Sequence, residues 1–350
     1  MQMEREKKLS HSVWGGIDVA KDKFDAALYL PVAPGQMPRD IMSLPKKTFA
    51  LTPDGVKKFH QWSVHIREEA DIEGGKMRLV MEATGRYSKD LTRWFNEEMP
   101  FTGPAIEDPK TIKNFIKSLK LRNKTDEIDA GALARYGAER MPEPFQEMPE
   151  DYQYLQELTR MRSAILDQLT AAEARLKEIN GFKKLEKIQQ QMVKSIAQAV
   201  KKMELEIKRC VNDSRELREN VKLATTIPGV ALITAATVLG ECGPLSRHTS
   251  RQTGSYSGIA PQIRQSGTSV RGSKISRHGP KRLRKVLYMA SISAIEGNPR
   301  MRALYERLVT KGKTKMQARC AVMRKLLLLI RAVVVNKTEY QDNFSNKIRI

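Results

Sequence analysis

The chain of 350 residues is poor in aromatic residues and cysteines. Aromatic side chains make up only 6% of it, and no amphipathic pattern combines them with a basic face, which argues against a protein of the membrane surface. The three cysteines, Cys210, Cys242 and Cys320, are far apart and lack partners at zinc-ligand spacing. We therefore expect neither a disulfide framework nor a zinc site, and these thiols suit the bacterial or archaeal cytoplasm.

Long apolar runs are missing as well. The first residues are polar and charged, so they do not resemble a signal peptide. The most apolar stretch, Leu326–Ile330 followed by Ala332–Val335, is interrupted by Arg331 and is too short to cross a bilayer. It predicts a buried helix or strand, and we expect no membrane partner.

Acidic residues are scarce only in the last third of the chain. Residues 221–350 contain 24 basic and 5 acidic side chains, whereas residues 1–140 contain 24 and 21, and residues 141–220 contain 14 and 14. Nearly all of the net charge of +22 therefore comes from this third. Such a segment repels itself unless it meets a polyanion, so nucleic acid is the expected partner.

The first 140 residues alternate between strand and helix patterns. The expected strands are 13–20, 24–30, 46–51, 77–82 and 101–106, with a hairpin turn at 21–23. The expected helices are 53–67, with Thr52 as its cap, 86–98 and 109–119. This alternation predicts a mixed α/β sheet covered by helices.

The rest of the chain is predominantly helical in pattern. Apolar residues three or four apart predict two long helices, 152–179 and a second through 188–207, separated by a stop at Asn180-Gly181. The pair forms either a coiled coil between protomers or a packed hairpin within its own chain. Further on, Pro228-Gly229 precedes a helix, as in the phosphate-binding helix-hairpin-helix, although an ordinary packed hairpin fits equally well.

Four acids stand where they could share a cation. Asp126 and Asp129 are three residues apart, which places both carboxylates on one face of a helix. Asp18 and Glu82 each lie at the end of an apolar, strand-like run. Four such acids indicate magnesium chemistry on phosphate. Their neighbours, Asp22 and Asp25 among them, are expected to be solvated turn residues.

A segment rich in hydroxyl and basic groups lies between residues 265 and 280, before an expected helix at 281–295. We expect it to be either a phosphate-contacting loop or a merely solvated one. Ser266, Thr268 and Ser269 are equivalent candidates for a nucleophile on this pattern alone. The expected nucleic-acid contacts are Lys124, Arg264, Arg271, Lys274, Arg277, Lys281 and Arg282.

Three motifs together resemble the DEDD transposases of insertion sequences, a family that includes pilin-inversion recombinases and bridge-RNA-guided recombinases. They are Gly-Ile-Asp18-Val-Ala-Lys, Met-Glu82-Ala-Thr-Gly-Arg-Tyr, and Lys-Thr-Asp126-x-x-Asp129-Ala. In the last third, Ile-Pro-Gly229, Gly258-Ile-Ala-Pro and Gln-Ser266-Gly-Thr-Ser-Val-Arg-Gly are similar to that family's transposase domain. The resemblance covers roughly residues 13–136 and 222–335.

The resemblance implies three domains. A RuvC-like domain of the ribonuclease H fold would span 1–145, a helical coiled-coil arm 150–221, and a mostly helical, basic transposase domain 222–350 with a helix-hairpin-helix-like element. The four acids would hold Mg²⁺ or Mn²⁺, and Ser266 would become covalently joined to DNA. The partners implied are donor and target double-stranded DNA, a structured noncoding bridge RNA that pairs with both, and further copies in a homodimer or homotetramer.

We therefore expect a site-specific DNA recombinase of an insertion sequence. Two other functions fit the same residues. A metal-dependent, structure-selective nuclease would use the acids with water and leave Ser266 as a phosphate contact. A noncatalytic RNA- or DNA-binding protein would use only the basic third, and the four intact acids count against it.

Overall fold

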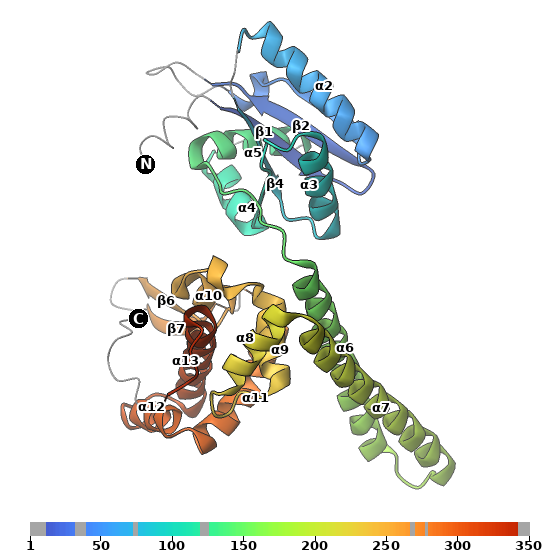
Figure 1. Ribbon diagram of the computed structural model, residues 1–350, viewed down its shortest axis with the longest axis vertical. Coiled ribbons are helices and arrows are strands. Elements are labelled where there is room, and N and C mark those ends of the chain that lie inside the picture. Colours follow the sequence, from blue (N-terminus) through green and yellow to red (C-terminus); the bar gives the residue numbers. More distant parts are fainter. Residues whose placement is uncertain are drawn as a thin grey trace. The chain divides into compact units, whose positions relative to one another are not determined.

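The computed structural model describes residues 12–31, 40–72, 76–119, 126–266, 270–276 and 279–341, with the backbone alone at 126–128, 262–266 and 270–274. The chain forms two compact units, residues 1–147 and 148–350 (Figure 1). We describe each unit by itself. None of the described helices is long and apolar enough to span a bilayer.

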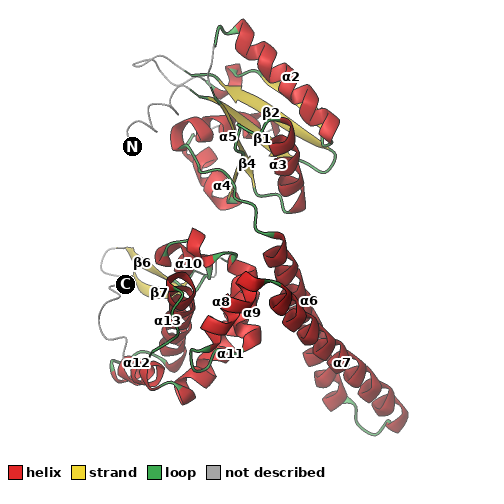
Figure 2. Ribbon diagram, in the orientation of Figure 1, coloured by secondary structure: helices red, strands yellow, loops and turns green. Residues whose placement is uncertain are grey.

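The first unit is built on a five-stranded sheet in the order β3-β2-β1-β4-β5 (Figures 1 and 2). The strands are β1 Val13–Val19, β2 Lys23–Tyr29, β3 Lys46–Ala50, β4 Met77–Glu82 and β5 Ala105–Glu107. β1, β2 and β3 form an antiparallel meander, whereas β4 and β5 run parallel to β1. The alternation of strand and helix patterns thus gives the mixed α/β sheet that was predicted.

Helices cover both faces of this sheet. On one face, α2 (Pro53–Glu69) and α3 (Arg86–Glu98) bury Phe59 and Phe95 against Phe24. On the other, α4 (Pro109–Ser118) and α5 (Asp126–Arg140) enclose a second core around Trp14. A 3₁₀ turn, η1 (Ile41–Ser43), packs beside α5.

Local signals fix where two of these helices begin. Thr52 caps α2 as predicted, because its hydroxyl accepts a hydrogen bond from the Gly55 N–H at 3.1 Å. Asp108 caps α4, accepting from the N–H of Lys110 at 2.8 Å and of Thr111 at 3.3 Å. Both helices carry proline in the first turn, where the missing N–H costs no hydrogen bond.

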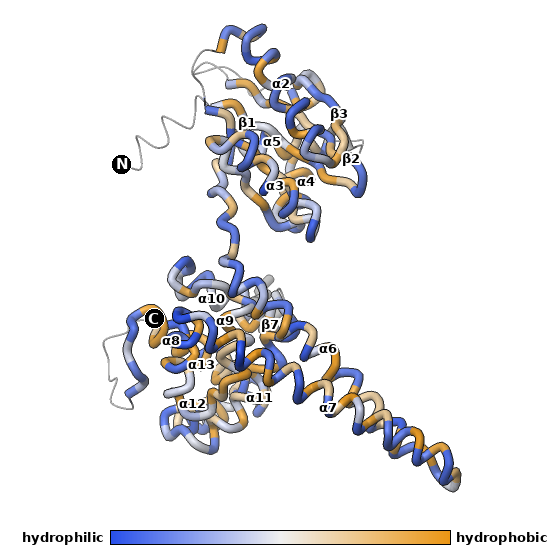
Figure 3. Tube along the Cα trace, turned by 45° about the vertical axis from the view of Figure 1, so that its right-hand side comes forward, coloured by the Kyte–Doolittle hydropathy of each residue, from blue (hydrophilic) through white to orange (hydrophobic). Residues whose placement is uncertain are grey.

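The second unit begins with two long antiparallel helices, α6 (Glu150–Glu178) and α7 (Lys183–Asp213). The chain reverses at Gly181, whose φ of 82° favours glycine. Polar contacts join the helices, including Arg162 Nε to Glu204 at 2.9 Å and Gln189 Nε2 to the Ala172 carbonyl at 2.8 Å. Figure 3 shows polar and apolar residues alternating along both of them.

The remaining helices of this unit surround a core in which α9 (Leu232–Cys242) is almost wholly buried. The other elements are α8 Arg215–Thr225, η2 Leu245–Arg247, α10 Ser250–Tyr256, α11 Lys281–Gly297, α12 Pro299–Thr310 and α13 Lys315–Asn336. The apolar stretch 326–335 lies within α13 and is a buried helix. The first turns of α6 and the last turns of α7 contribute to the same core.

One predicted loop is a hairpin. Residues 261–266 form β6 and residues 270–275 form β7, paired antiparallel from Pro261↔Ile275 to Ser266↔Val270. The prediction of a loop was wrong because glycines and serines obscured the strand propensity of the β-branched residues Ile263, Val270 and Ile275. A smaller difference concerns β5, which begins at Ala105 and extends past the predicted end to Glu107.

Candidate active site

Sheet register brings two of the predicted acids together. β1 and β4 pair in parallel up to Ile17↔Met81, so Asp18 and Glu82 are the next residues of the two neighbouring strands. Ile17 and Met81 point into the core beneath α2 and α3. Because side chains alternate between the faces of a sheet, Asp18 and Glu82 both point to the opposite face, the one covered by α5.

The same row contains two further acids. Asp25 pairs with Asp18 across the β1–β2 ladder, and Glu107 pairs with Glu82 across the β4–β5 ladder. Glu107, Glu82, Asp18 and Asp25 therefore form a carboxylate row across four adjacent strands. Glu107 was not predicted from the sequence, and the prediction that Asp25 is a solvated turn residue was wrong, since Asp25 lies in β2 and is only 5% exposed.

Two side chains hold Asp25 in place. Lys23, two residues away on the same face of β2, contacts its Oδ2 at 2.9 Å. Thr48, its partner across the β2–β3 ladder, donates a hydrogen bond to its Oδ1. The lysine offsets part of the repulsion expected between facing carboxylates of Asp25 and Asp18.

α5 lies directly on the row because β1 carries glycine at position 16. A Cβ atom there would lie 2.1 Å from both the Ala130 carbonyl oxygen and the Ala134 amide nitrogen. Two residues before Gly16, on the same face of β1, Trp14 packs on Gly137. Two residues of strand advance about as far as one helical turn, so the following strand position, Asp18, lies beside the first turn of α5.

That first turn carries the other two predicted acids. α5 begins at Asp126, of which the backbone alone is described. Asp129 follows three residues later; its side chain is half-buried and its Oδ1 is shielded from solvent. The amino end of a helix is electropositive, which favours carboxylates in its vicinity. Among the described side chains, no three His, Cys, Asp or Glu residues gather closely enough to hold a metal ion.

Burial affects one end of the row. It raises the pKa of the Glu107 carboxyl above its ordinary value, while a hydrogen bond from Tyr136 of α5 acts in the opposite direction. The pKa of Tyr136 is raised by burial and by the charge of Glu107. This end of the row therefore favours a neutral carboxyl more strongly than a solvated glutamate would.

Ser266 lies in the second unit, at the last residue of β6, where the hairpin turns. Arg264, Arg271 and Lys274 occupy the two strands, and only their backbone is described. The two ends of the hairpin are joined by a hydrogen bond from the Ser276 N–H to the Ala260 carbonyl at 3.0 Å. Four predicted residues lie outside the described chain: Lys124, Thr268, Ser269 and Arg277.

The two predicted contacts on α11 differ in their surroundings. Lys281 is exposed at the first position of the helix. Arg282 instead contacts a buried acid, with 2.7 Å between its Nε and Glu241 Oε1. The Pro228-Gly229 turn is tightly packed, because a Cβ at Gly229 would lie 2.6 Å from the Ala294 backbone of α11.

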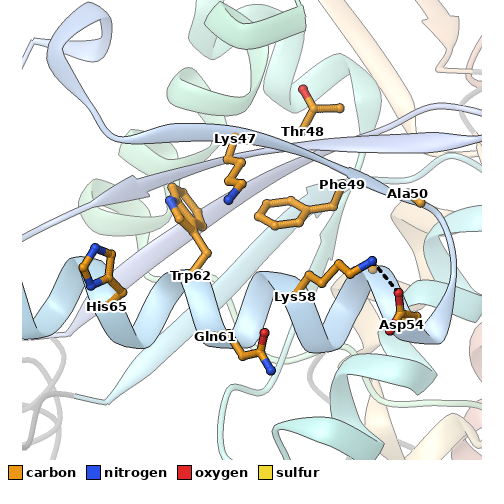
Figure 4. A pocket seen from close by; sticks show the side chains of 10 residues that line it. Lys47, Thr48, Phe49, Ala50, Asp54, Lys58, Gln61, Trp62 and His65 are labelled. Carbon is orange, nitrogen blue, oxygen red and sulfur yellow. Dashed lines mark ion pairs between the residues drawn. The ribbon is translucent and has the colours of Figure 1, made fainter.

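A groove of about 440 Å³ lies between β3 and α2 (Figure 4). Lys47 points into it between Trp62 and Phe49, and Lys58 pairs with Asp54 at 2.8 Å. Because Lys47 and Phe49 alternate with Thr48 along β3, the groove opens on the α2 side, opposite the carboxylate row. It is separate from the candidate site.

Comparisons with known proteins place the chain in a family. A family model described as a transposase, of the DEDD IS110 type, matches residues 15–179, and one described as the transposase IS116/IS110/IS902 family matches residues 221–306. The chain is 30% identical over 322 residues to the pilin gene-inverting protein of Moraxella bovis, covering 91% of this chain and 94% of that protein. The protein of the same name from Moraxella lacunata gives the same values.

A third relative matches a shorter part of this chain. An insertion element IS110 protein of 43.6 kDa from Streptomyces coelicolor is 31% identical over 119 residues, which is 34% of this chain and 29% of that protein. The long relatives span both units, and the two family models together include all four predicted acids and Ser266. The chain belongs to the DEDD insertion-sequence transposase family and is a DNA-recombining enzyme.

Proposed function

We propose that this protein is a site-specific recombinase that cuts and rejoins DNA with its acids and Ser266 acting together. The observation that carries the proposal is the convergence of Asp18, Glu82 and the first turn of α5 on one face of the sheet. The strand order, with an antiparallel β1–β3 meander and parallel β4 and β5, supports a RuvC-like ribonuclease H fold for this unit.

Asp18, Glu82, Asp126 and Asp129 would bind Mg²⁺ or Mn²⁺. Carboxylate oxygens are the ligands that these hard cations prefer, and the row gathers more negative charge than Lys23 alone offsets. When bound, the cation would supply Lewis-acid polarisation of a phosphodiester. The protein's own contribution is positional, because the sheet ladder and the contact at Gly16 fix the strand acids against α5.

Ser266 would be the nucleophile. Its hydroxyl oxygen forms a bond to phosphorus, the bond from phosphorus to one deoxyribose oxygen breaks, and that oxygen leaves with a proton. The phosphoserine diester keeps the energy of the broken bond, so a second deoxyribose hydroxyl can attack it, rejoin DNA and release the serine. The place of Ser266 beside the hairpin turn supports this role.

A structured RNA would select the DNA sites by base pairing, while the protein contacts nucleic-acid backbone. The excess of basic residues in 221–350 supports binding of several duplexes. Further copies of the chain would associate through the distal part of α6 and α7, where Phe182, Leu185 and Ile188 are 53–67% exposed. Acids and serine lie in separate compact units, so a second protomer could complete the site.

A covalent adduct separates this mechanism from hydrolysis by water. The protein is incubated with DNA carrying the ends of its own element, RNA transcribed from the flanking sequence, and Mg²⁺, then denatured in SDS. We expect a protein–DNA adduct that is lost in Ser266→Ala and retained in Ser257→Ala, a buried serine outside the hairpin.

Cleavage with free ends and without adduct would instead support the nuclease that uses water. A persistent adduct in Ser266→Ala would assign the nucleophile to another hydroxyl. Omission of the RNA in the same assay tests the guide, because an unchanged reaction would remove it from the mechanism.

A further inference from the structure

Glu241 is a buried charge that the proposed chemistry does not use. It lies near the end of α9, and its side chain is 0% exposed. Burial of an ionised carboxylate costs several kcal/mol, and buried ion pairs often contribute little to stability. Its Oε2 is shielded from solvent and receives no hydrogen bond from the described residues. The groups that Glu241 contacts therefore offer the best explanation of its burial.

Two arginines share the other oxygen of this carboxylate. Arg282 donates from Nε to Oε1 at 2.7 Å, and the Nε of Arg160 on α6 lies 3.6 Å from the same atom. Arg282 is thus held by a hydrogen bond through Nε, whereas Arg160 is held by an ion pair, since its buried Nε makes no hydrogen bond with the described residues. Within the described part of the chain, the Nη groups of Arg282 make no hydrogen bond, and one Nη of Arg160 contacts Glu157 at 3.0 Å.

The arginine pair keeps access to solvent. The side chain of Arg160 is 35% exposed and that of Arg282 is 38% exposed, although their shared acid is fully buried. The contact to Glu157 is a surface pair, with this glutamate 68% exposed, so it is weak and easily replaced by another anion. The Nη edge of Arg282 and that of Arg160, which holds only this weak surface contact, suit a phosphate, because a phosphate accepts several hydrogen bonds at once.

The cluster lies at the root of the β6–β7 hairpin. Tyr256, at the end of α10, is five residues before β6, and Arg282 follows β7 by seven residues. The chain segments that enter and leave the hairpin touch, because a Cβ at Gly279 would lie 1.8 Å from the Tyr256 carbonyl oxygen. Burial, together with Cys242 and Glu241, raises the pKa of Tyr256 to about 12, so its hydroxyl remains a donor at neutral pH.

We propose that Arg160 and Arg282, oriented by Glu241, form a binding site for one phosphate of the DNA strand that approaches the β6–β7 hairpin. This arginine clamp requires only that the chain binds DNA, so it stands whether Ser266 or water attacks the phosphodiester. It also explains the burial of Glu241, which fixes both guanidinium groups before DNA arrives and reduces the entropy that binding costs.

A purely structural role for the three charges is the alternative. α6 and α9 are already joined without them, since Gln156 Nε2 donates to the Gly240 carbonyl at 3.0 Å and the backbones are in close contact there. The two roles predict different behaviour of DNA affinity. If the three charges only stabilise the fold, their removal lowers stability; if they form a clamp, their removal lowers the DNA affinity of the folded protein.

The experiment measures binding of labelled random-sequence duplex DNA by fluorescence anisotropy over a series of salt concentrations, with duplex RNA of equal length in parallel. Glu241→Gln removes a negative charge, so charge alone predicts tighter binding, whereas the clamp predicts roughly fivefold weaker binding. Glu306→Gln, the same change at an exposed position of α12, is the matched control and is expected to bind as tightly as wild type or tighter. Thermal unfolding of each variant confirms that it is folded.

A second measurement holds even if Glu241→Gln does not fold. Arg160→Met and Arg282→Met are each expected to weaken binding about fivefold and to lower the salt slope by about one ion. The double variant is expected to lose less than the product of the two effects, because one phosphate is shared. Independent losses, Glu241→Gln binding as tightly as Glu306→Gln, or a loss confined to RNA would each overturn the proposal.

Discussion

The two units treat acidic side chains in opposite ways. The first collects Glu107, Glu82, Asp18 and Asp25 in one row across a sheet, although its overall charge is nearly balanced. The second unit has few acids in its last 130 residues, and it buries one of them, Glu241, between two arginines. In the first unit the acids form the candidate site, whereas in the second unit an acid orients two arginine side chains.

This difference separates two tasks. A row of carboxylates repels DNA and becomes useful only with a cation, whereas a basic unit attracts DNA without one. We therefore expect substitutions in the row to abolish strand cleavage with little effect on DNA affinity. Substitutions around the hairpin root are expected to act first on affinity.

The largest effect is expected for the acids themselves. Asp18→Asn preserves size and removes a charge at the centre of the row, so recombination should fall by at least about a thousandfold in Mg²⁺. DNA affinity by anisotropy should stay within about twofold of wild type, because the change lies outside the basic residues of 221–350. Asp22→Asn, at an exposed turn position, is the control. Persistent recombination in Asp18→Asn would remove this residue from the site.

The next effect concerns the contact that positions the row. Gly16→Val places side-chain atoms where the Ala130 and Ala134 backbone lies, so α5 must move away from β1. We expect a loss of about 3 kcal/mol or more in unfolding free energy, measured by chemical denaturation. Gly297→Ala is the matched control, since a Cβ there meets no atom within 4 Å, and it should raise stability by about 0.5 kcal/mol.

Destabilisation by Gly16→Val should occur without loss of the second unit's core, because the two compact units have separate cores. Hydrogen exchange resolved along the chain checks this. Equal loss of protection in α9 and α13 would contradict the division into independent units.

A smaller effect is expected at Asp25. Its carboxylate faces Asp18 and is tied to Lys23 and Thr48, so it fixes the charge next to the candidate ligands. Asp25→Asn should raise the Mn²⁺ concentration for half-maximal cleavage by about fivefold, with a smaller loss at saturating Mn²⁺. Thr48→Val, which removes only one hydrogen bond, should give a weaker shift in the same direction. An unchanged Mn²⁺ requirement in both variants would make Asp25 purely structural.

Sequence patterns predicted the framework because the signals for it are local. Thr52 followed by proline marks the start of α2, and the apolar run before Glu82 marks β4. Asp25 was misjudged because its environment depends on pairing with β1 and β3, which residue spacing does not specify. Arg282 was predicted to contact nucleic acid, but its partner Glu241 is 41 positions away and is brought to it only by the packing of α9 and α11.

The hairpin shows a different limit. Val270 and Ile275 favour a strand, but the intervening Gly272 and Ser273 are typical of loops, so local propensity was ambiguous. Choice of Ser266 over neighbouring hydroxyls depended on family resemblance, and it stays a prediction. The strand register explains the positions of the acids far better than the role of Ser266, because four strands and one helix meet at the carboxylate row.

The smallest expected effect is the pH dependence of Glu107. Burial raises its pKa, so between its ordinary value near 4.5 and the raised value the folded protein binds more protons than the unfolded chain. Stability from this group is therefore present at low pH and lost as pH rises through the folded pKa. Glu107→Gln removes the penalty, and its melting temperature should exceed that of wild type by about 2 °C at neutral pH, with the gap closing near pH 4. Tyr136→Phe, which removes the hydrogen bond that favours the charged carboxylate, should steepen the loss, whereas a wild-type stability that rises over this range relative to Glu107→Gln would show that the carboxylate row favours charge at this end.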